Sequence, residues 1–430
     1  MQAGDTIMAL SSGALPAGVA VIRLSGPRVQ EILKQIAGGV PSPRQMALRR
    51  IGAGQMLDQG LVAFFPAPHS FTGEDCAELQ VHGSPAGVRA ILAQLATLGL
   101  RLAEAGEFTR RAFENGKLDL VEIEGLGDLL SAETEKQRQQ ALSRFDGRLT
   151  EKITQWRESL LDLRAEIEAR LDFSDEGDVP EDLPDQWQHQ LGALEAAIRT
   201  SLASLESGRI VREGIRVALA GAPNAGKSSL INALAKSDLA IVSDEAGTTR
   251  DVREVPLDIN GQLFILLDLA GLRESDSKAE AEGVRRAQRA IETADVVLWL
   301  SAPDVEDIAP SGVSGQLVRI GTKSDLGSQT GVDISISTKS LDGLTALRQR
   351  LDGLAANVTG SEPSLVSHER DRLALSGSLT ALEETRRNLG DWELAAESLR
   401  RASAALERLI GRIDAERVLD RLFSSFCIGK

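Results

Sequence analysis

Residues 221–230, GAPNAGKSSL, form a glycine-bracketed run that ends in a lysine and two serines, a combination suited to binding phosphate. A strand-like apolar run at 215–220 precedes it, and a stretch of helical composition follows. Strand, glycine loop and helix are the context that the P-loop pattern G-x-x-x-x-G-K-[ST] requires. The glycines let successive N–H groups converge on a β-phosphate, Lys227 supplies positive charge, and the hydroxyl of Ser228 suits Mg²⁺. We therefore expect this loop to bind the phosphates of a nucleotide.

A second set of polar residues follows another apolar run. LFILLD at 263–268 ends in Asp268, and Gly271 follows three residues later. An aspartate at the carboxyl end of a buried strand can hold Mg²⁺ through water, and the N–H of such a glycine can reach a γ-phosphate. The loop between the two runs contains Thr248 and Thr249, so a threonine is available as a further Mg²⁺ ligand.

Two short runs later in the segment suit a guanine base. Thr322-Lys323-Ser324-Asp325 follows an apolar run, and Ser337-Thr338-Lys339 follows a strand-like stretch. The carboxylate of Asp325 can accept hydrogen bonds from N1–H and the exocyclic amine of guanine; we expect it to be buried, so that adenine, which lacks those donors, is disfavoured. The stem of Lys323 would pack over the base, and the 337–339 run would offer a backbone N–H to guanine O6. Because all these runs occur in one order along the chain, they identify a GTPase domain.

Two positions depart from the usual pattern. Thr322 stands where asparagine is usual, so we expect the side-chain amide that ties this loop to the P-loop to be missing and nucleotide binding to be weaker but unaltered in kind. Leu272 stands where Ras-like enzymes place a glutamine, and a leucine side chain cannot orient water. Hydrolysis must then recruit a partner's arginine, a bound cation near Asn224, or an acid from the run at 273–283. That run also reads as an ordinary solvated loop.

Composition limits the class of protein. The chain has 430 residues, enough for two or three domains, and only two cysteines, which excludes a disulfide framework. No run approaches the roughly 20 apolar residues of a membrane span, and the N-terminus lacks a secretory pattern, so we expect a cytoplasmic protein without membrane contact. The net charge of −15 means that contact with nucleic acid requires a local basic patch or a basic partner.

The elements that position these residues fall into three parts. Residues 1–115 mix short strands with a helix and predict a small α+β domain. Apolar residues at three- and four-residue steps predict long helices before and after the nucleotide segment, at 116–212 and 356–430. The nucleotide domain occupies 213–355. We expect one discontinuous helical bundle with a Ras-like α/β P-loop GTPase domain inserted between its halves; two independent helical domains are the alternative.

The chain resembles the MnmE (TrmE) family of bacterial tRNA uridine-modification GTPases along its whole length. The residues that carry the resemblance include IRLSG (22–26), SFTGEDCAELQVHGSP (70–85), GEFTRRAFENGKLDL (106–120), IVSDEAGTTRDV (241–252) and the terminal FSSFCIGK (423–430). The last is the most specific, because a Cys-Ile-Gly-Lys terminus behind an inserted G domain is typical of this family.

The resemblance implies an activity and partners. It implies a homodimer whose N-terminal domain binds a one-carbon tetrahydrofolate and forms the dimer, and a helical domain around a potassium-activated GTP hydrolase that also needs Mg²⁺. It implies a heterotetramer with the FAD-containing protein MnmG (GidA), with FAD on the partner. Together they would build a (carboxymethyl)aminomethyl group on C5 of wobble uridine in certain tRNAs. The partner would make most of the tRNA contact, in agreement with the acidic charge.

The resemblance also assigns residues. For potassium these are Asn224, Ser243, Glu245 through its carbonyl, and Thr248; for magnesium, Ser228 and Thr249; for folate, Arg23, Glu78, Lys117 and Lys430. Glu280 matches the water-orienting glutamate, although Glu282 competes for that role. Glu280, Lys227 and Cys427 are the expected catalytic residues, and Cys76 is expected in the core. The complete GTP-binding set is Asn224, Ala225, Gly226, Lys227, Ser228, Ser229, Ser243, Thr248, Thr249, Asp268, Gly271, Thr322, Lys323, Asp325, Ser337, Thr338 and Lys339.

Two classes of function stay open from the sequence. One is a tRNA-modifying enzyme in which GTP turnover drives a conformational cycle; the other is a switch GTPase of ribosome assembly. The N-terminal folate-type residues and the FCIGK terminus favour the first. An RNA-binding appendage with a GxxG loop and basic flanks would favour the second, and the sequence contains none.

Overall fold

The computed structural model describes residues 4–172, 182–236, 241, 253–268, 288–306, 313, 315–360, 363–413, 419 and 429. By their internal contacts the residues divide into two compact units, 1–127 with 404–430, and 128–403. Among the described helices, none combines the length and apolarity needed to cross a bilayer.

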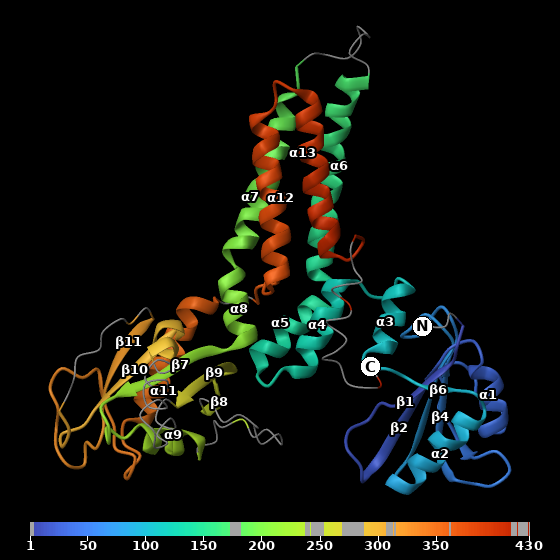
Figure 1. Cartoon of the computed structure of the whole chain (residues 1–430), viewed down its shortest axis with the longest axis horizontal. Helices are drawn as coiled ribbons and strands as arrows, with labels where there is room; N and C mark the ends of the chain where they lie inside the picture. The colour runs from blue at the N-terminus through green and yellow to red at the C-terminus, as the bar shows by residue number, and fades with distance from the viewer. Residues whose placement is uncertain are drawn as a thin grey trace, which may run out of the picture. The chain divides into compact units, whose positions relative to one another are not determined.

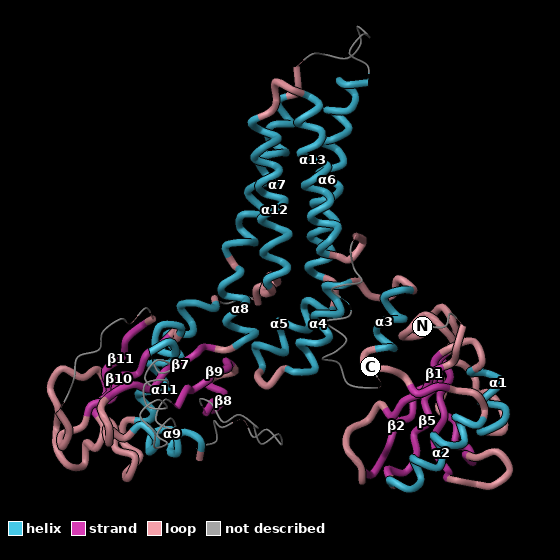
Figure 2. The backbone as a smooth tube through the Cα atoms, in the orientation of Figure 1, coloured by secondary structure: helices cyan, strands magenta, loops and turns pink. Residues whose placement is uncertain are grey.

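The first unit is built on a six-stranded sheet in the order β3-β4-β5-β2-β1-β6. All neighbouring pairs are antiparallel except β1 with β6. Alternate residues of the strands face helices α1 and α2 and form a continuous apolar core, which confirms the predicted α+β fold (Figure 2). The elements are β1 (Ile7–Leu10), β2 (Ala17–Ser25), α1 (Val29–Ile36), β3 (Ala47–Ile51), β4 (Asp58–Phe65), β5 (Cys76–Gly83), α2 (Pro85–Thr97), β6 (Arg101–Leu102) and α3 (Glu107–Glu114).

Helices before and after the nucleotide segment pack together as one bundle (Figure 1). Residues of α6 at three- and four-residue steps, from Leu149 to Ile167, are buried, as the periodicity predicts. Ion pairs join α7 to α12, including Arg386 with Glu195 at 3.1 Å, so the two halves of the chain form a single bundle. The helices of the bundle are α5 (Glu135–Phe145), α6 (Arg148–Asp172), α7 (Asp185–Ala203), α8 (Leu205–Glu213), α12 (Glu369–Arg387) and α13 (Trp392–Leu409). Helix α4 (Leu120–Ser131) begins in the first unit and ends in the second.

Helices α12 and α13 end earlier than the apolar pattern predicts. In the sequence, apolar residues at helical spacing continue to Leu389 and to Ile413, whereas α12 ends at Arg387 and α13 at Leu409. A glycine follows each end within three residues, and glycine favours helix termination.

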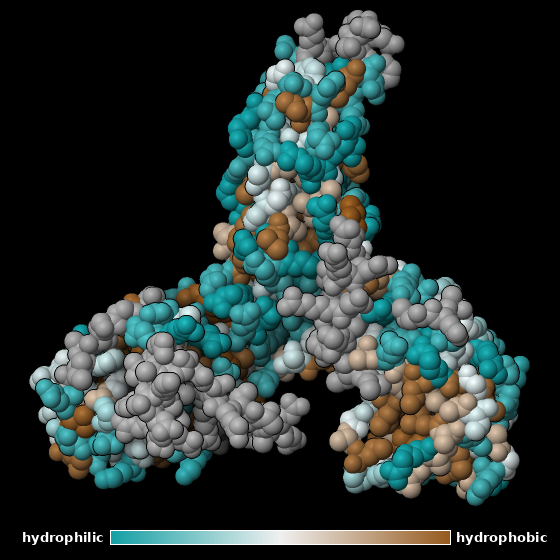
Figure 3. Space-filling view, in the orientation of Figure 1, coloured by the Kyte–Doolittle hydropathy of each residue, from teal (hydrophilic) through white to brown (hydrophobic). Residues whose placement is uncertain are grey.

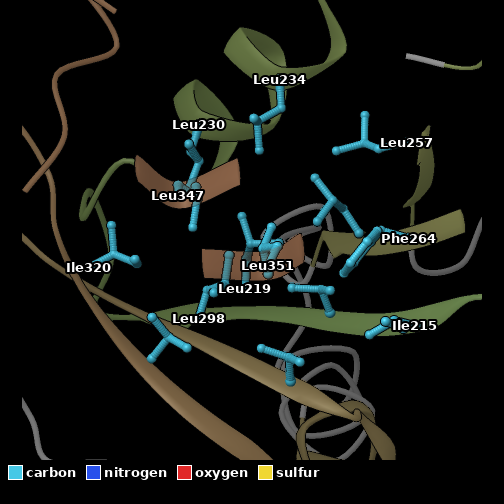
Figure 4. Packing of buried hydrophobic residues seen from close by; sticks show 14 of the residues in the cluster. Ile215, Leu219, Leu230, Leu234, Leu257, Phe264, Leu298, Ile320, Leu347 and Leu351 are labelled. Carbon is cyan, nitrogen blue, oxygen red and sulfur yellow. The ribbon is translucent and has the colours of Figure 1, made fainter. Parts of the chain in front are cut away.

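The inserted domain is a second six-stranded sheet, in the order β12-β11-β10-β7-β9-β8. Only β8 is antiparallel to its neighbour. Leucine, isoleucine and phenylalanine side chains from the sheet interlock with leucines of α9 and α11 (Figure 4). The predicted α/β fold is therefore present, although the last strand has only two residues. The elements are β7 (Ile215–Gly221), α9 (Lys227–Ala235), β8 (Arg253–Ile259), β9 (Gln262–Asp268), β10 (Val296–Ser301), β11 (Gln316–Gly321), β12 (Ile334–Ser335) and α11 (Leu344–Thr359).

Candidate nucleotide site

The polar runs predicted to bind GTP follow the carboxyl ends of parallel strands. β7 leads into the P-loop, β9 ends in Asp268, and the two base-reading runs follow β11 and β12. β7 lies between β10 and β9, where the strand order changes direction. Open parallel sheets bind ligands outside the carboxyl ends of their strands at such a point. Strand order thus places all four runs along one edge.

The backbone of the P-loop requires its glycines. Gly221 has φ +136°, and a Cβ there would lie 2.2 Å from the carbonyl oxygen of Leu300, so no other residue fits. Gly226 has φ +89° and Asn224 has φ +65°. The ammonium of Lys227 donates to the carbonyl oxygens of Gly221 at 2.7 Å and Ala222 at 2.9 Å. The side chain of Lys227 therefore folds back over the P-loop and places its positive charge against the carbonyl oxygens at the start of the loop.

Helix α9 begins at this loop and directs its N-terminus toward the same edge. Its first residue is Lys227, and Ser228 and Ser229 are exposed in its first turn. Ala225, at the base of the loop, is completely buried. The free N–H groups and the dipole of a helix N-terminus favour an anion. The exposed hydroxyls of Ser228 and Ser229 therefore lie where an anion is favoured.

Asp268 ends β9 beside the P-loop strand. Its partner in the β7–β9 register is Leu219, two residues before Gly221. The side chain is 7% exposed. A carboxylate in this position is suited to hold a hydrated Mg²⁺ next to the phosphates.

Thr322 corrects one sequence-based expectation. Its hydroxyl donates to the carbonyl oxygen of Ala225 at 2.7 Å and also lies 2.9 Å from the carbonyl oxygen of Ser301. The usual side-chain amide is absent, as expected, but the base loop is still tied to the P-loop, by a hydroxyl. A Cβ added at Gly226 would lie only 3.4 Å from Thr322 Oγ1, so the two loops are in close contact.

Asp325 corrects a second expectation, since its side chain is 28% exposed and not buried. Ser337 Oγ donates to its Oδ1 at 3.0 Å, and Lys339 Nζ lies 3.2 Å from its Oδ2. The hydrogen bond from Ser337, followed by the one from Lys339, lowers the pKa of Asp325. The carboxylate is thus held ionised as an acceptor, and the loops after β11 and β12 meet through it.

The remaining base-loop residues are also near these contacts. Lys323 has φ +53° and forms an ion pair with Asp304, with Nζ–Oδ distances of 2.6 and 2.8 Å. Thr338 belongs to the run 337–339, in which Ser337 Oγ accepts from the N–H of Lys339 at 3.3 Å. Several predicted site residues lie outside the described residues: Ser243, Glu245, Thr248, Thr249, Gly271, Glu280, Cys427 and Lys430.

A second polar site lies in the N-terminal unit. Arg23 on β2 and Glu78 on β5 are partners in register and form an ion pair at 2.9 Å. The guanidinium of Arg23 lies 5.5 Å from the ring centre of Phe71 and 5.8 Å from that of Phe108. Cation–π attraction adds to the ion pair in this arrangement. Arg23 therefore faces two aromatic rings, and the side chains of Arg23 and Glu78 are 22% and 23% exposed.

Lys117 lies beside the loop that carries Phe71. It is exposed after α3, and its Cγ would lie 3.4 Å from a Cβ at Gly73. Gly429, the described residue nearest the chain's end, accepts a hydrogen bond from Ser11 Oγ at 3.0 Å. A Cβ at Gly429 would lie 2.6 Å from the carbonyl oxygen of Leu10, so the tail approaches the β1–β2 connection closely.

Sequence reasoning missed a partly buried ionic cluster in the same unit. Arg111 contacts Asp5 at 2.6 Å, Glu107 at 3.0 Å and Glu74 at 3.1 Å. Arg101 binds Asp5 and Glu107 as well. Burial opposes ionisation of Asp5 and Glu107, but hydrogen bonds from the arginines outweigh it and lower the pKa of both. The only signal in the sequence was the four-residue spacing of Glu107 and Arg111.

Cys76 lies next to this cluster and is 4% exposed, which confirms its predicted place in the core. Its Sγ is 3.1 Å from Thr72 Oγ1 and 3.5 Å from Ser25 Oγ. Ser25 in turn donates to Glu74 at 2.7 Å. The thiol is thus a small packed group in a hydrogen-bonded layer.

Comparison with known proteins covers the whole chain. A family model described as the MnmE helical domain matches residues 120–427, and one described as the GTP-binding protein TrmE N-terminus matches residues 6–117. Proteins named tRNA modification GTPase MnmE from Azorhizobium caulinodans and Rhizobium meliloti are each 48% identical, over 100% of this chain and 100% of their own length. One from Brucella anthropi is 46% identical over 99% of this chain and 98% of its own. Among solved structures, the G domain of the T. maritima FeoB iron transporter is 23% identical over 33% of this chain and 98% of its own, with a TM-score of 0.24.

Proposed function

The chain belongs to the MnmE family of tRNA modification GTPases, and from that premise we propose how it works. We propose a potassium-activated GTP hydrolase that, with an FAD-containing partner, adds a (carboxymethyl)aminomethyl group to C5 of wobble uridine from a one-carbon folate. The observation that carries the GTPase part is the meeting of the P-loop, Asp268, the Thr322 loop and the Ser337 loop along one edge of a parallel sheet.

The P-loop residues fit a nucleotide phosphate. The cradle at Gly221 admits no Cβ, and the ammonium of Lys227 is held on loop carbonyls. In the proposed mechanism this ammonium shifts from the carbonyls to the β- and γ-phosphates, and the N-terminus of α9 stabilises their charge. Ser228 and Thr249 would ligate Mg²⁺, with Asp268 holding it through water. Bound Mg²⁺ neutralises charge that develops during phosphoryl transfer.

A monovalent cation is the proposed substitute for an arginine finger. Asn224, with an exposed side chain and φ +65°, sits at the outer turn of the P-loop. Its amide oxygen, with Ser243, Thr248 and the carbonyl of Glu245, would ligate K⁺, and Glu280 would orient the attacking water. The cation supplies positive charge near the transferring phosphate.

Guanine selection is proposed to rest on Asp325. Ser337 and Lys339 hold its carboxylate ionised. The N1–H and exocyclic amine of guanine match two acceptor oxygens, whereas adenine presents an acceptor at N1. In this proposal specificity comes from an oriented and charged acceptor, and burial follows when the base is bound.

The N-terminal unit is proposed to bind folate and to form a homodimer. Arg23, Glu78 and Lys117 border the loop that carries Phe71 and Gly73, and a charged group beside aromatic rings suits a pterin. The contact of Gly429 with Ser11 supports a contribution from the tail residues Cys427 and Lys430.

The open face of the N-terminal sheet supports the homodimer. Figure 3 shows apolar residues gathered over this unit. Val19, Leu48 and Leu61 are 57%, 60% and 39% exposed, and Leu48 and Leu61 are cross-strand partners. Contiguous apolar surface of this kind marks protein interfaces. The net charge of −15 supports a basic partner, MnmG, as the main tRNA-binding surface of a cytoplasmic complex.

Two measurements test the proposal. GTP hydrolysis by the purified full chain is compared in K⁺ and Na⁺ at equal ionic strength, with Asn224→Ala as the variant; we expect faster turnover in K⁺ only for the parent. Equal rates in both salts contradict potassium activation. Mass analysis of wobble uridines from a strain that lacks the gene then separates tRNA modification from ribosome assembly. Normal uridine modification in that strain overturns the tRNA assignment.

A further inference from the structure

Helix α5 contacts the inserted GTPase domain at a place remote from the nucleotide edge. The N–H of Lys136 donates to the carbonyl oxygen of Gly261 at 3.0 Å. Gly261 lies in the turn between β8 and β9, whereas Lys136 is the second residue of α5 in the helical bundle. The first N–H groups of a helix have no partner within it. A turn of the GTPase domain therefore caps a helix of the bundle.

Both sides of this contact are rigid. On the helix side, Gln137 Oε1 accepts from the N–H of Thr134 at 3.0 Å and closes a capping box. On the turn side, Asp258 Oδ1 accepts from the N–H of Gly261 at 2.7 Å, and Asn260 Nδ2 donates to Asp352 on α11 at 2.7 Å. A displacement of the β8–β9 turn therefore displaces the N-terminus of α5 by a similar amount, and the reverse also holds.

A second set of bonds joins α5 to the chain where it enters the GTPase domain. Gln137 Nε2 donates to the carbonyl oxygen of Arg212 at 2.9 Å, and Gln140 Nε2 donates to that of Gly208 at 3.1 Å. Gln262, the completely buried first residue of β9, donates to the carbonyl oxygen of Ile210 at 3.2 Å. The entering helix α8 is therefore held by α5 and by β9 at once.

The chain that leaves the GTPase domain is tied to the same helix. Gln140 Nε2 also donates to the carbonyl oxygen of Ser364 at 2.8 Å. Arg144 is completely buried, donates to the carbonyl oxygen of Leu365, and forms an ion pair with the equally buried Asp371 at 2.8 Å. Buried ion pairs add little net stability but favour one geometry, because a shifted pair leaves a charge uncompensated. The chain segments that enter and leave the GTPase domain are therefore both fixed to α5 in one arrangement.

The β8–β9 hairpin connects this joint to the nucleotide edge. β9 runs from Gln262 at the joint to Asp268, the proposed Mg²⁺-side carboxylate. β8 pairs with it from Ile259 back to Arg253, which follows the loop that contains the proposed cation ligands. Seven residues of strand span about 23 Å at roughly 3.3 Å each. A stiff two-stranded lever of that length ends on the N-terminus of α5.

From this geometry we propose that the β8–β9 hairpin, seated on α5, is a rigid coupling that passes the nucleotide state of the GTPase domain to the helical bundle. The inference rests on the proposed function, in which GTP turnover drives tRNA modification. The contact between the β8–β9 turn, α8 and α5 transmits movement and does not act as a hinge. These three elements stay together through the GTP hydrolysis cycle. Motion is therefore expected elsewhere, and loosening this joint separates hydrolysis from modification.

The test loosens the joint at the Lys136–Gly261 bond. Lys136→Pro removes the N–H in the first helical turn, where proline is tolerated. Lys136→Ala is the matched control; it keeps the N–H and loses only the 3.4 Å contact of Nζ with Thr359. The readout is modified wobble uridine per GTP hydrolysed, by the full chain with its FAD-containing partner, tRNA and a one-carbon folate. We expect Lys136→Pro to hydrolyse GTP at the parent rate and to lower the yield about tenfold, within the range of known coupling energies.

A second variant keeps the test decisive if the proline disrupts α5. Gln262→Met preserves shape in the buried site and removes the bonds from Nε2 to the carbonyl oxygens of Ile210 and Leu263. We expect the same loss of yield. An unchanged yield in folded Lys136→Pro or in Gln262→Met overturns the coupling. Absence of GTP hydrolysis or of modification in the parent chain counts against the proposed function instead.

A third arm locks the joint. A Cβ at Gly261 would lie 3.4 Å from the Cβ of Glu135, close to the spacing of about 3.5–4.5 Å in disulfides. The double variant Glu135→Cys with Gly261→Cys is compared oxidised and reduced, with the parent chain treated identically as the control for Cys427. Because the joint is rigid, we expect the rate of hydrolysis and the yield to change by less than about twofold between the oxidised and reduced states, below the usual coupling range of about 5–150-fold. Loss of modification on oxidation alone shows that the turn must leave α5, and overturns the proposal.

Discussion

The two sheets carry polar sites of opposite construction. At the edge of the parallel sheet, backbone conformation makes the site: Gly221 and Gly226 shape the loop, and a few hydroxyls join it to its neighbours. On the antiparallel sheet, side chains make the site, since Arg23, Glu78 and the Arg111 cluster meet by strand pairing. The site made by backbone conformation comes from short contiguous stretches of sequence, and its residues can be exposed to solvent. The second depends on buried charge, so its failure should appear as unfolding and not as lost turnover.

The largest expected effect is on the side-chain site. Arg111→Met removes the buried cation that Asp5, Glu74 and Glu107 share and leaves Arg101 as the cation for Asp5 and Glu107. Breaking a buried pair such as Arg111 with Glu107 costs about 3–5 kcal/mol. We expect the N-terminal unit to unfold at lower temperature while GTP hydrolysis stays at the parent rate. Calorimetry measures the first and a phosphate-release assay the second. Arg28→Met, which removes an exposed pair with Glu31, is the control and should change little.

Next in size is the effect of removing charge from the backbone site. Lys227→Ala should lower kcat/KM for GTP by about 10²–10³-fold, the usual cost of losing one group that stabilises transition-state charge. The thermal transition should not move, because the lost bonds are to loop carbonyls. Lys236→Ala, at the other end of α9, provides the matched control. Equal losses in both variants mean that Lys227 has no special role.

Changing the residue that is proposed to select guanine should have a smaller effect on turnover and should shift the preference toward another base. Asp325→Asn replaces two acceptors by one donor and one acceptor, which suits the 2-oxo group of xanthine. We expect GTP turnover to fall by about 10–100-fold, the cost of one or two charged hydrogen bonds, and XTP to be preferred. Competition between the two nucleotides is the measurement. A variant that still prefers GTP places guanine recognition elsewhere.

The tie between the base loop and the P-loop should matter less. Thr322→Val keeps the shape and removes the hydroxyl that bonds to Ala225 and Ser301. Loss of one buried hydrogen bond costs about 1–2 kcal/mol, so GTP should bind roughly tenfold more weakly. Thr322→Ser restores a hydroxyl and should bind as the parent does. If valine and serine behave alike in a nucleotide-binding titration, the hydroxyl contributes nothing.

Near neutral pH, the smallest expected effect is that of pH on the stability of the N-terminal unit, through the acids of the Arg111 cluster. The pKa values of Asp5 and Glu107 are lowered in the folded chain, so their contribution to stability is present above their unfolded pKa values and is lost as the pH falls through the folded ones. The unfolding temperature of the N-terminal unit should thus be level around pH 7 and fall below about pH 4. In Arg111→Met the acid-dependent fall should be smaller. An identical pH profile in both proteins rejects the cluster as its source.

The difference between the two sites also explains what the sequence could predict. The P-loop, Asp268 and the base runs were found because their chemistry lies in short contiguous stretches between apolar strands. The exposure of Asp325 and the hydroxyl tie of Thr322 could not be found, since both depend on how loops from β7, β11 and β12 pack. Asp5 is 96 residues from Arg101 and 106 from Arg111, and it meets them only through the β1–β6 pairing and α3. Helix periodicity predicted the bundle and its insertion, but not that α5 would be capped by a turn of the inserted domain.

The pairing of α7 with α12 has a consequence for synthesis on the ribosome. Helix α7 ends at Ala203, and its partner α12 begins only at Glu369. At translation rates of about 5–20 residues per second, roughly 10–30 s pass between the synthesis of the end of α7 and the start of α12. During that interval the buried side chains of α7, among them Trp187, Leu191 and Ile198, have no α12 to cover them. The nascent chain is then a natural client for chaperones, while the GTPase domain, complete within its own stretch, can fold before the bundle closes around its ends.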